Sequence, residues 1–241
     1  MSEWSLPTDT KKVSIEKSGG FLWDSGVYPV KVKLAYLDQA KSGATSFNII
    51  LENNEGKELK NTMYIRSGKA KKNSTTYTKD GVKYPLPGYS TAESLCRAAT
   101  GKNLEQNIMA HEKKQVKIYD FEQQKDVVQE RPVLVNLLGA SVQVAVSRIK
   151  ENKSKKNADG DYVDTDDIRE INECKFFGNA DGFSADEISE NIPEAKALPS
   201  WHKVNAGKVI DKSKTAVGTG ANSAAGIMGT TPAAAPAASL F

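Results

Sequence analysis

The stretch VYPVKVKLAYL, residues 27–37, alternates apolar and other side chains along its length. One face carries the apolar side chains, namely Val30, Val32, Leu34 and Tyr36. Lys31 and Lys33 fall on the opposite face. A period of two residues predicts a strand with one buried and one solvated face. The fold is therefore expected to open on a half-buried β-strand.

Two more strands are predicted directly after this one, over residues 45–52 and 58–65. They are separated by Asn-Asn-Glu-Gly at 53–56. Asn and Gly tolerate the positive φ that a tight hairpin turn requires. The first three strands are therefore expected to form an antiparallel sheet.

A short helix is predicted over residues 90–101. Ser90 followed by Glu93 matches a capping box, and Gly101 is a natural C-terminal stop. The same Ser-x-x-Glu spacing predicts a second short helix at 184–191.

The remaining segments are rich in strand-forming residues. Alternation predicts a strand at 115–122, and the run at 132–150 is long and β-rich, with Gly139 suggesting a bulge or sharp bend. Asp159-Gly160 predicts a hairpin within 157–178. Antiparallel strands with one inserted helix and a bulge favour a mainly β fold, namely an OB-like Greek-key barrel with one or two short helices.

The 241 residues are expected to form one domain followed by a tail. The domain would span 1–202, with an N-terminal extension at 1–20 and an acidic hairpin at 151–178. Residues 203–241 are rich in Gly, Ala and Pro and are predicted to be disordered. The chain has neither a run of about 20 apolar residues nor a signal-peptide pattern at its start, which predicts a cytoplasmic protein that does not contact a membrane.

Charge is distributed unevenly along the chain, although the net charge is only +3. Residues 60–83 contain seven Lys and Arg side chains against Asp80 alone, whereas residues 151–194 contain thirteen acidic side chains against five basic ones. This uneven distribution of charge indicates a cationic surface that is able to bind a polyanion.

Motifs of enzymes are absent from the sequence. It contains no Walker loop, no GxGxxG, no GxSxG and no HExxH. The two histidines, His111 and His202, and the two cysteines, Cys96 and Cys174, are isolated, and we expect buried, reduced thiols and no metal or cofactor. The sequence therefore favours a protein that is not an enzyme.

The acidic hairpin offers two alternatives, both of which the sequence disfavours. An EF-hand loop starting at Asn157 fails because Tyr162 stands where glycine is needed and Ile168 stands where glutamate is needed. Asp164, Asp166 and Asp167 could in principle hold two metals for phosphoryl transfer, which would make the chain a nuclease. A solvated hairpin is the preferred interpretation of these acids.

The basic segment KAKKNSTTYTKDGVKYPLPGY, residues 69–89, carries the strongest functional signal. Cations beside tyrosines are typical of proteins that bind single-stranded nucleic acid, because cations neutralise phosphates and rings stack on unpaired bases. The predicted DNA-binding residues are Arg66, Lys69, Lys71, Lys72, Tyr77, Lys79 and Lys83. Tyr36, Phe47 and Tyr64 could add a stacking surface, although these strand positions suit core packing equally well.

The chain resembles bacteriophage single-stranded DNA-binding proteins. The resemblance rests on GVYPVKVKLAYL, SFNIILENNEGKEL, YTKDGVKYPLPGYSTAESLC and a low-complexity tail that ends in phenylalanine. It implies a protein that coats single-stranded DNA during phage replication or recombination in the host cytoplasm. A homo-oligomer is compatible with this role.

The resemblance also implies that the tail recruits phage replication or recombination proteins, here through Leu240 and Phe241. The tail usually carries acidic residues in such proteins, whereas residues 237–241 contain no acidic side chain. The alternatives are a non-enzymatic protein-interaction or virion structural module and a strand-annealing recombination protein.

Overall fold

The computed structural model describes residues 22–120, 123–156 and 162–214. The strands in these residues are β1 (Gly26–Gln39), β2 (Thr45–Asn53), β3 (Glu58–Arg66), β4 (Thr76–Lys79), β5 (Val82–Pro85), β6 (Glu112–Asp120), β7 (Lys125–Val133), β8 (Ser141–Lys156), β9 (Tyr162–Gly178) and β10 (Val209–Asp211). The helices are α1 (Pro87–Thr100), α2 (Leu104–Met109), α3 (Ala185–Ser189) and α4 (Ala197–Asn205), with single 3-10 turns η1 (Lys69–Lys71) and η2 (Val135–Leu137). Among the described residues, no helix is both long enough and apolar enough to cross a membrane. The fold is mainly β, as predicted.

The main sheet follows the order β3, β2, β1, β8, β9, with every neighbouring pair antiparallel. Strand β1 is long enough to pair with β2 over 30–39 and with β8 over 26–31. The predicted opening hairpins are confirmed, and Gly56 has the positive φ of +75° that its turn was expected to need. Short β10 is the exception to the antiparallel rule, since it pairs parallel with β8.

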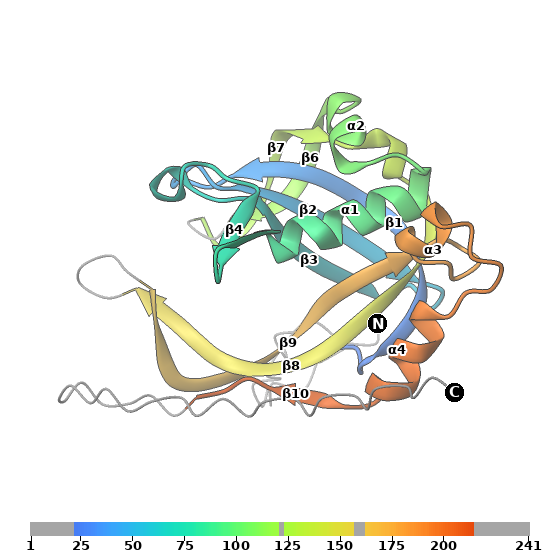
Figure 1. Cartoon of the computed structure of the whole chain (residues 1–241). Coiled ribbons are helices and arrows are strands. Elements are labelled where there is room, and N and C mark those ends of the chain that lie inside the picture. Colours follow the sequence, from blue (N-terminus) through green and yellow to red (C-terminus); the bar gives the residue numbers. More distant parts are fainter. Residues whose placement is uncertain (1–21, 121–122, 157–161, 215–241) are drawn as a thin grey trace, which may run out of the picture.

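Helix α1 packs against both β3 and β9, which are the two end strands of this order (Figure 1). Glycine at position 88 permits this arrangement, because a Cβ there would lie 2.5 Å from the backbone oxygen of Tyr64 in β3. Between the described residues of β3 and β9 there is no strand pairing. The seam between the two end strands is therefore spanned by a helix.

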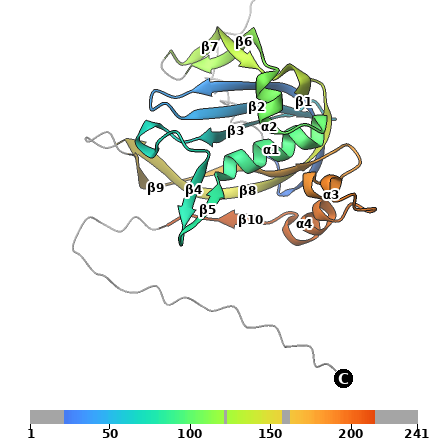
Figure 2. The same cartoon turned by 45° about the horizontal axis from the view of Figure 1, so that its top comes forward.

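Two hairpins extend from the main sheet. Strands β8 and β9 continue together past the sheet as a long curved arm, while β6 and β7 form a second hairpin that meets β1 at the Tyr36 and Val133 pair (Figures 1 and 2). The antiparallel pairing of β8 with β9 confirms the predicted acidic hairpin, although its Asp159-Gly160 turn lies outside the described residues.

The core lies between the inner face of the sheet and α1. Its largest fully buried side chains include Phe47, Leu95 and Phe177. Cys96 and Cys174 are buried free thiols, as predicted. Burial, with smaller contributions from nearby Glu93 and Glu173, raises the pKa of both thiols to about 12. Both cysteines are therefore protonated and unreactive at neutral pH.

The predicted start of the first helix is wrong. Helix α1 begins at Pro87, so Ser90 lies inside its first turn and makes no capping box. Proline suits the first helical position because its missing N–H has no intrahelical partner there. Glu93 instead pairs with Arg97 at 2.5 Å and accepts the backbone N–H of Leu104 at 2.6 Å. The predicted stop is confirmed, because Gly101 follows the helix in the left-handed conformation.

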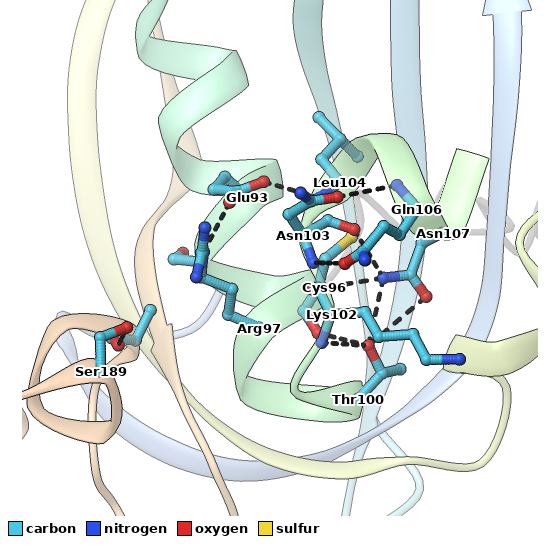
Figure 3. A network of polar contacts seen from close by, with 12 residues as sticks. Glu93, Cys96, Arg97, Thr100, Lys102, Asn103, Leu104, Gln106, Asn107 and Ser189 are labelled. Atoms are coloured by element: carbon cyan, nitrogen blue, oxygen red, sulfur yellow. Dashed lines mark hydrogen bonds and ion pairs between the residues drawn. The ribbon is translucent and has the colours of Figure 1, made fainter. Parts of the chain in front are cut away.

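Helix α2 was not predicted from the sequence, although Asn103 and Gln106 form a complete capping box at its start. Its buried Asn107 donates to the Thr100 hydroxyl at 3.1 Å and to the backbone oxygen of Asn103 at 2.9 Å (Figure 3). These contacts fix the turn between α1 and α2. They therefore hold the C-terminal end of α1, while Gly88 holds its N-terminal end against β3.

The β-rich run at 132–150 is divided into several elements. It contains the end of β7, the turn η2 and the start of β8. Gly139 has a φ of +77° and donates its N–H to the backbone oxygen of Val32 at 2.8 Å, which confirms the predicted sharp bend.

The predicted tail boundary at 203 needs correction. Helix α4 continues to Asn205, and β10 follows. The Asn152 amide then holds the backbone of Lys214, with its oxygen accepting at 2.6 Å and its nitrogen donating at 2.8 Å. The folded part therefore extends to residue 214, whereas the rest of the predicted tail, including Leu240 and Phe241, lies outside the described residues.

Glu187 in α3 links the two C-terminal helices. The predicted capping box with Ser184 is present, and the same carboxylate accepts the backbone N–H groups of Lys196 and Ala197 at 2.7 and 2.8 Å. Burial acts to raise the pKa of Glu187, but hydrogen bonds from the backbone N–H groups of Ser184, Lys196 and Ala197 outweigh it and lower that pKa to about 2.

We expect Glu187→Gln to lower the free energy of unfolding at neutral pH by about 1–3 kcal/mol, because charged hydrogen bonds are lost. A folded pKa below the unfolded value of about 4.3 means that this stabilisation is complete above the unfolded pKa and is lost as the pH falls through the folded pKa. The difference between wild type and variant should therefore shrink from about pH 4.5 downward in urea melts. Exposed Glu190→Gln is the control, and an equal loss there would contradict this role.

Candidate nucleic-acid-binding groove

A groove of about 960 Å³ runs along the seam between β3 and β9. Four parts of the chain line it: the β1–β2 turn, β3 with the segment after it, the start of α1, and the β8–β9 arm with Lys212. One side of the groove is thus made by the sheet and its loops, and the other by the arm. The antiparallel order of the strands brings these distant parts of the sequence together.

Four cationic side chains lie on the sheet side of the groove, and we call them the cationic rim: Lys41, Arg66, Lys69 and Lys71. Arg66, Lys69 and Lys71 are exposed, and Arg66 donates from Nε to the backbone oxygen of Asn73 at 2.8 Å. This bond holds the guanidinium beside the loop that carries the two lysines. Clustered cations of this kind attract phosphates and release counterions when they bind them.

The rim is held in place by contact between two loops. The backbone N–H of Lys69 donates to the backbone oxygen of Ser42 at 2.9 Å. Gly68 allows this approach, since a Cβ there would lie 2.9 Å from the same oxygen. The loop after β3 is therefore docked on the β1–β2 turn, which places Lys41 beside the lysines of η1.

Tyr64 is the aromatic residue that lines the groove. It alternates with buried Met63 and Ile65 on β3, and its side chain is 56% exposed. An exposed ring beside cations can stack on an unpaired base.

The arm side of the groove carries two carboxylates, which we call the carboxylate wall: Glu151 and Glu173. Glu151 accepts from Arg169 at 2.8 Å, and Glu173 accepts from Lys175 at 2.7 Å and from Lys212 at 3.2 Å. Burial acts to raise the pKa of Glu173, but the hydrogen bonds and charges of both lysines outweigh it and lower that pKa. Glu173 is therefore ionised at neutral pH, and the two sides of the groove differ in charge.

The β4–β5 hairpin carries several predicted residues away from the groove. It projects beside α1 (Figure 2), and every residue of its two strands is exposed. Tyr77 faces Tyr84 with ring centroids 5.8 Å apart, and Lys79 and Lys83 lie near the turn. Asp80 and Gly81 have φ values of +52° and +77°, so this dipeptide signal could have revealed the hairpin from the sequence.

The structure brings together part of the predicted site. Arg66, Lys69, Lys71 and Tyr64 line the groove, whereas the other predicted residues do not, namely Lys72, Tyr77, Lys79, Lys83, Tyr36 and Phe47. Tyr36 is half-buried, and Phe47 is 0% exposed within the core. The ring of Phe47 is therefore inaccessible to a base, and the stacking role considered for it is wrong.

Sequence reasoning missed Lys41, Lys212 and the carboxylate wall. Lys41 is the only basic residue between Lys33 and Lys57 in the sequence. Lys212 reaches the groove only because β10 lies along β8. No local pattern marks either residue. The Asp164, Asp166 and Asp167 cluster gains no support as a metal centre, since the described residues contain no group of three His, Cys, Asp or Glu side chains that could hold an ion.

No protein-family model matches the chain, and no curated protein matches it.

Proposed function

We propose that this protein binds single-stranded DNA with little sequence preference through the groove between β3 and β9. The observation that carries the proposal is the convergence of the cationic rim and exposed Tyr64 on one groove. Cations that neutralise phosphates and a ring that stacks on bases are the two elements of sequence-tolerant single-strand binding.

The strand order supports an OB-like interpretation of the sheet. A five-strand antiparallel order with a helix following the third strand is compatible with that architecture, in which oligonucleotides bind across the second and third strands and adjoining loops. The groove lies on β3 and the β1–β2 turn, so its position fits this mode of binding. The proposed biological role is protection of single strands during phage replication or recombination in the host cytoplasm.

The β4–β5 hairpin is proposed as a second contact for the same strand. Tyr77, Lys79 and Lys83 are exposed there, on a hairpin joined to the loop that carries Lys69 and Lys71. The exposed Tyr77 and Tyr84 pair offers further ring surface to bases that leave the groove.

A fluorescence anisotropy titration tests the proposal directly. Labelled single-stranded and duplex DNA of equal length are titrated with the full chain over a series of salt concentrations. The four rim cations predict a log-log salt slope of about −2.8 for the single strand, from about 0.7 per contact. A slope near zero, or preference for duplex DNA, would contradict the proposal.

A further inference from the structure

The two sides of the groove are chemically unequal. The rim carries four cations, whereas the wall carries Glu151 and Glu173 together with Lys212. The charge of Lys212 is already compensated, because its Nζ lies 3.2 Å from Glu173 Oε2. The wall carboxylates are likewise paired, Glu151 with Arg169 and Glu173 with Lys175 and Lys212, so a polyanion in the groove is attracted chiefly to the rim.

Both wall carboxylates keep an oxygen available for a ligand. The contacts of Glu173 with Lys175 and Lys212 both use Oε2, and the contacts of Glu151 with Arg169 both use Oε1. Within the described residues, Glu173 Oε1 and Glu151 Oε2 have no hydrogen-bond partner. The side chains are 40% and 29% exposed, so these oxygens can be reached.

We infer that the groove holds its strand in one orientation, with phosphates along the cationic rim and base edges toward the carboxylate wall, and that this wall favours bases with an exocyclic amino group, cytosine over thymine. The inference rests on the proposed function and adds a base preference to it. Orientation follows from the charges, since Arg66, Lys69 and Lys71 are exposed on the rim, whereas the cations beside the wall are already paired with carboxylates.

The preference follows from what an ionised carboxylate can accept. It is an acceptor only, and it pairs with the N4 amino group of cytosine. Thymine presents an oxygen at the same ring position, and its N3–H is flanked by two carbonyl oxygens that repel a carboxylate. Glu173 pairs with Ser147 of β8, and Glu151 lies four residues beyond Ser147 on the same strand. The two carboxylates are thus separated by roughly 13 Å along the arm, which is room for more than one base.

The test compares two oligonucleotides that share the ring methyl group, oligo-dT and oligo-5-methyl-dC of equal length, at neutral pH and fixed salt. We expect the 5-methyl-dC strand to bind about fivefold to tenfold more tightly, at the lower end of the discrimination measured for good base contacts. Equal and tight binding of both strands would overturn the inference and leave the proposed function standing. Failure of both strands to bind at low salt would instead remove the proposed function.

Glu151→Gln with Glu173→Gln tests whether the wall is responsible. We expect the variant to bind both strands more tightly, because Arg169, Lys175 and Lys212 lose their charged partners, and to lose most of the preference for 5-methyl-dC. Glu112→Gln with Glu130→Gln is the matched control, since both carboxylates are exposed, paired with lysines on the β6–β7 hairpin, and outside the groove. An unchanged preference for 5-methyl-dC in the wall variant, or an equal loss of that preference in the control, would overturn the inference. The single substitution Glu151→Gln provides a milder variant.

Discussion

Replacing Arg66, Lys69 and Lys71 by glutamine together should weaken binding of single-stranded DNA about 100-fold at 0.1 M salt. Each lost phosphate contact removes about 0.7 from the log-log salt slope, so the slope should flatten by about 2. The loss should be similar for strands of different sequence, because these side chains meet phosphates. Anisotropy titrations over a salt series measure both quantities.

The matched control is Lys113→Gln with Lys114→Gln and Lys117→Gln on β6. It removes the same three charges from exposed positions that do not line the groove. Its affinity and slope should stay close to wild type. Equal weakening by both triple variants would show that net charge, rather than the groove, governs binding.

Truncating Phe47 to alanine should lower the free energy of unfolding by about 3–5 kcal/mol, because a fully buried ring is replaced by a cavity. Tyr64→Ala should instead affect DNA binding and leave the stability of the fold nearly unchanged. Its ring is 56% exposed, so stability should change little, while affinity for single-stranded DNA should fall about 5- to 150-fold through the loss of stacking. Urea melts and anisotropy titrations on both variants separate the two roles.

Tyr64→Phe serves as the control for the ring itself. It keeps the stacking surface and removes only the hydroxyl, so binding should remain close to wild type. A large loss in Tyr64→Phe would indicate a hydrogen-bonding role in place of stacking. Unchanged binding in Tyr64→Ala would remove this residue from the site.

The elements that could be predicted are those encoded by neighbouring residues. The period of two in residues 27–37 gave β1, although a register shift between Val32 and Leu34 buries Ala35 in place of the predicted Leu34 and Tyr36. Asn-Asn-Glu-Gly gave the β2–β3 turn. Gly101 and Ser184 with Glu187 correctly marked a helix end and a helix start. Each is a local pattern whose physical cause lies within a few residues, so no tertiary information was required.

The errors share a different cause. Ser90 and Glu93 have the spacing of a capping box, but Pro87 starts the helix earlier and Glu93 is used by Arg97 and Leu104. Phe47 and Tyr64 both occupy strand positions, and only the packing of α1 and the sheet decides which ring is buried. Competition between partners that are distant in sequence is not visible in a local pattern.

The sequence by itself determined the first three strands, the turn at 53–56 and the cationic character of residues 60–83, because periodicity and charge are properties of the chain. Only the tertiary structure decided which cations share a surface. The pairing of β8 with both β1 and β9 brings Glu151 and Glu173 opposite Lys69 and Lys71, while Lys79 and Lys83 project away on the β4–β5 hairpin. A groove depends on distances between segments that are remote in sequence, and strand pairing sets those distances.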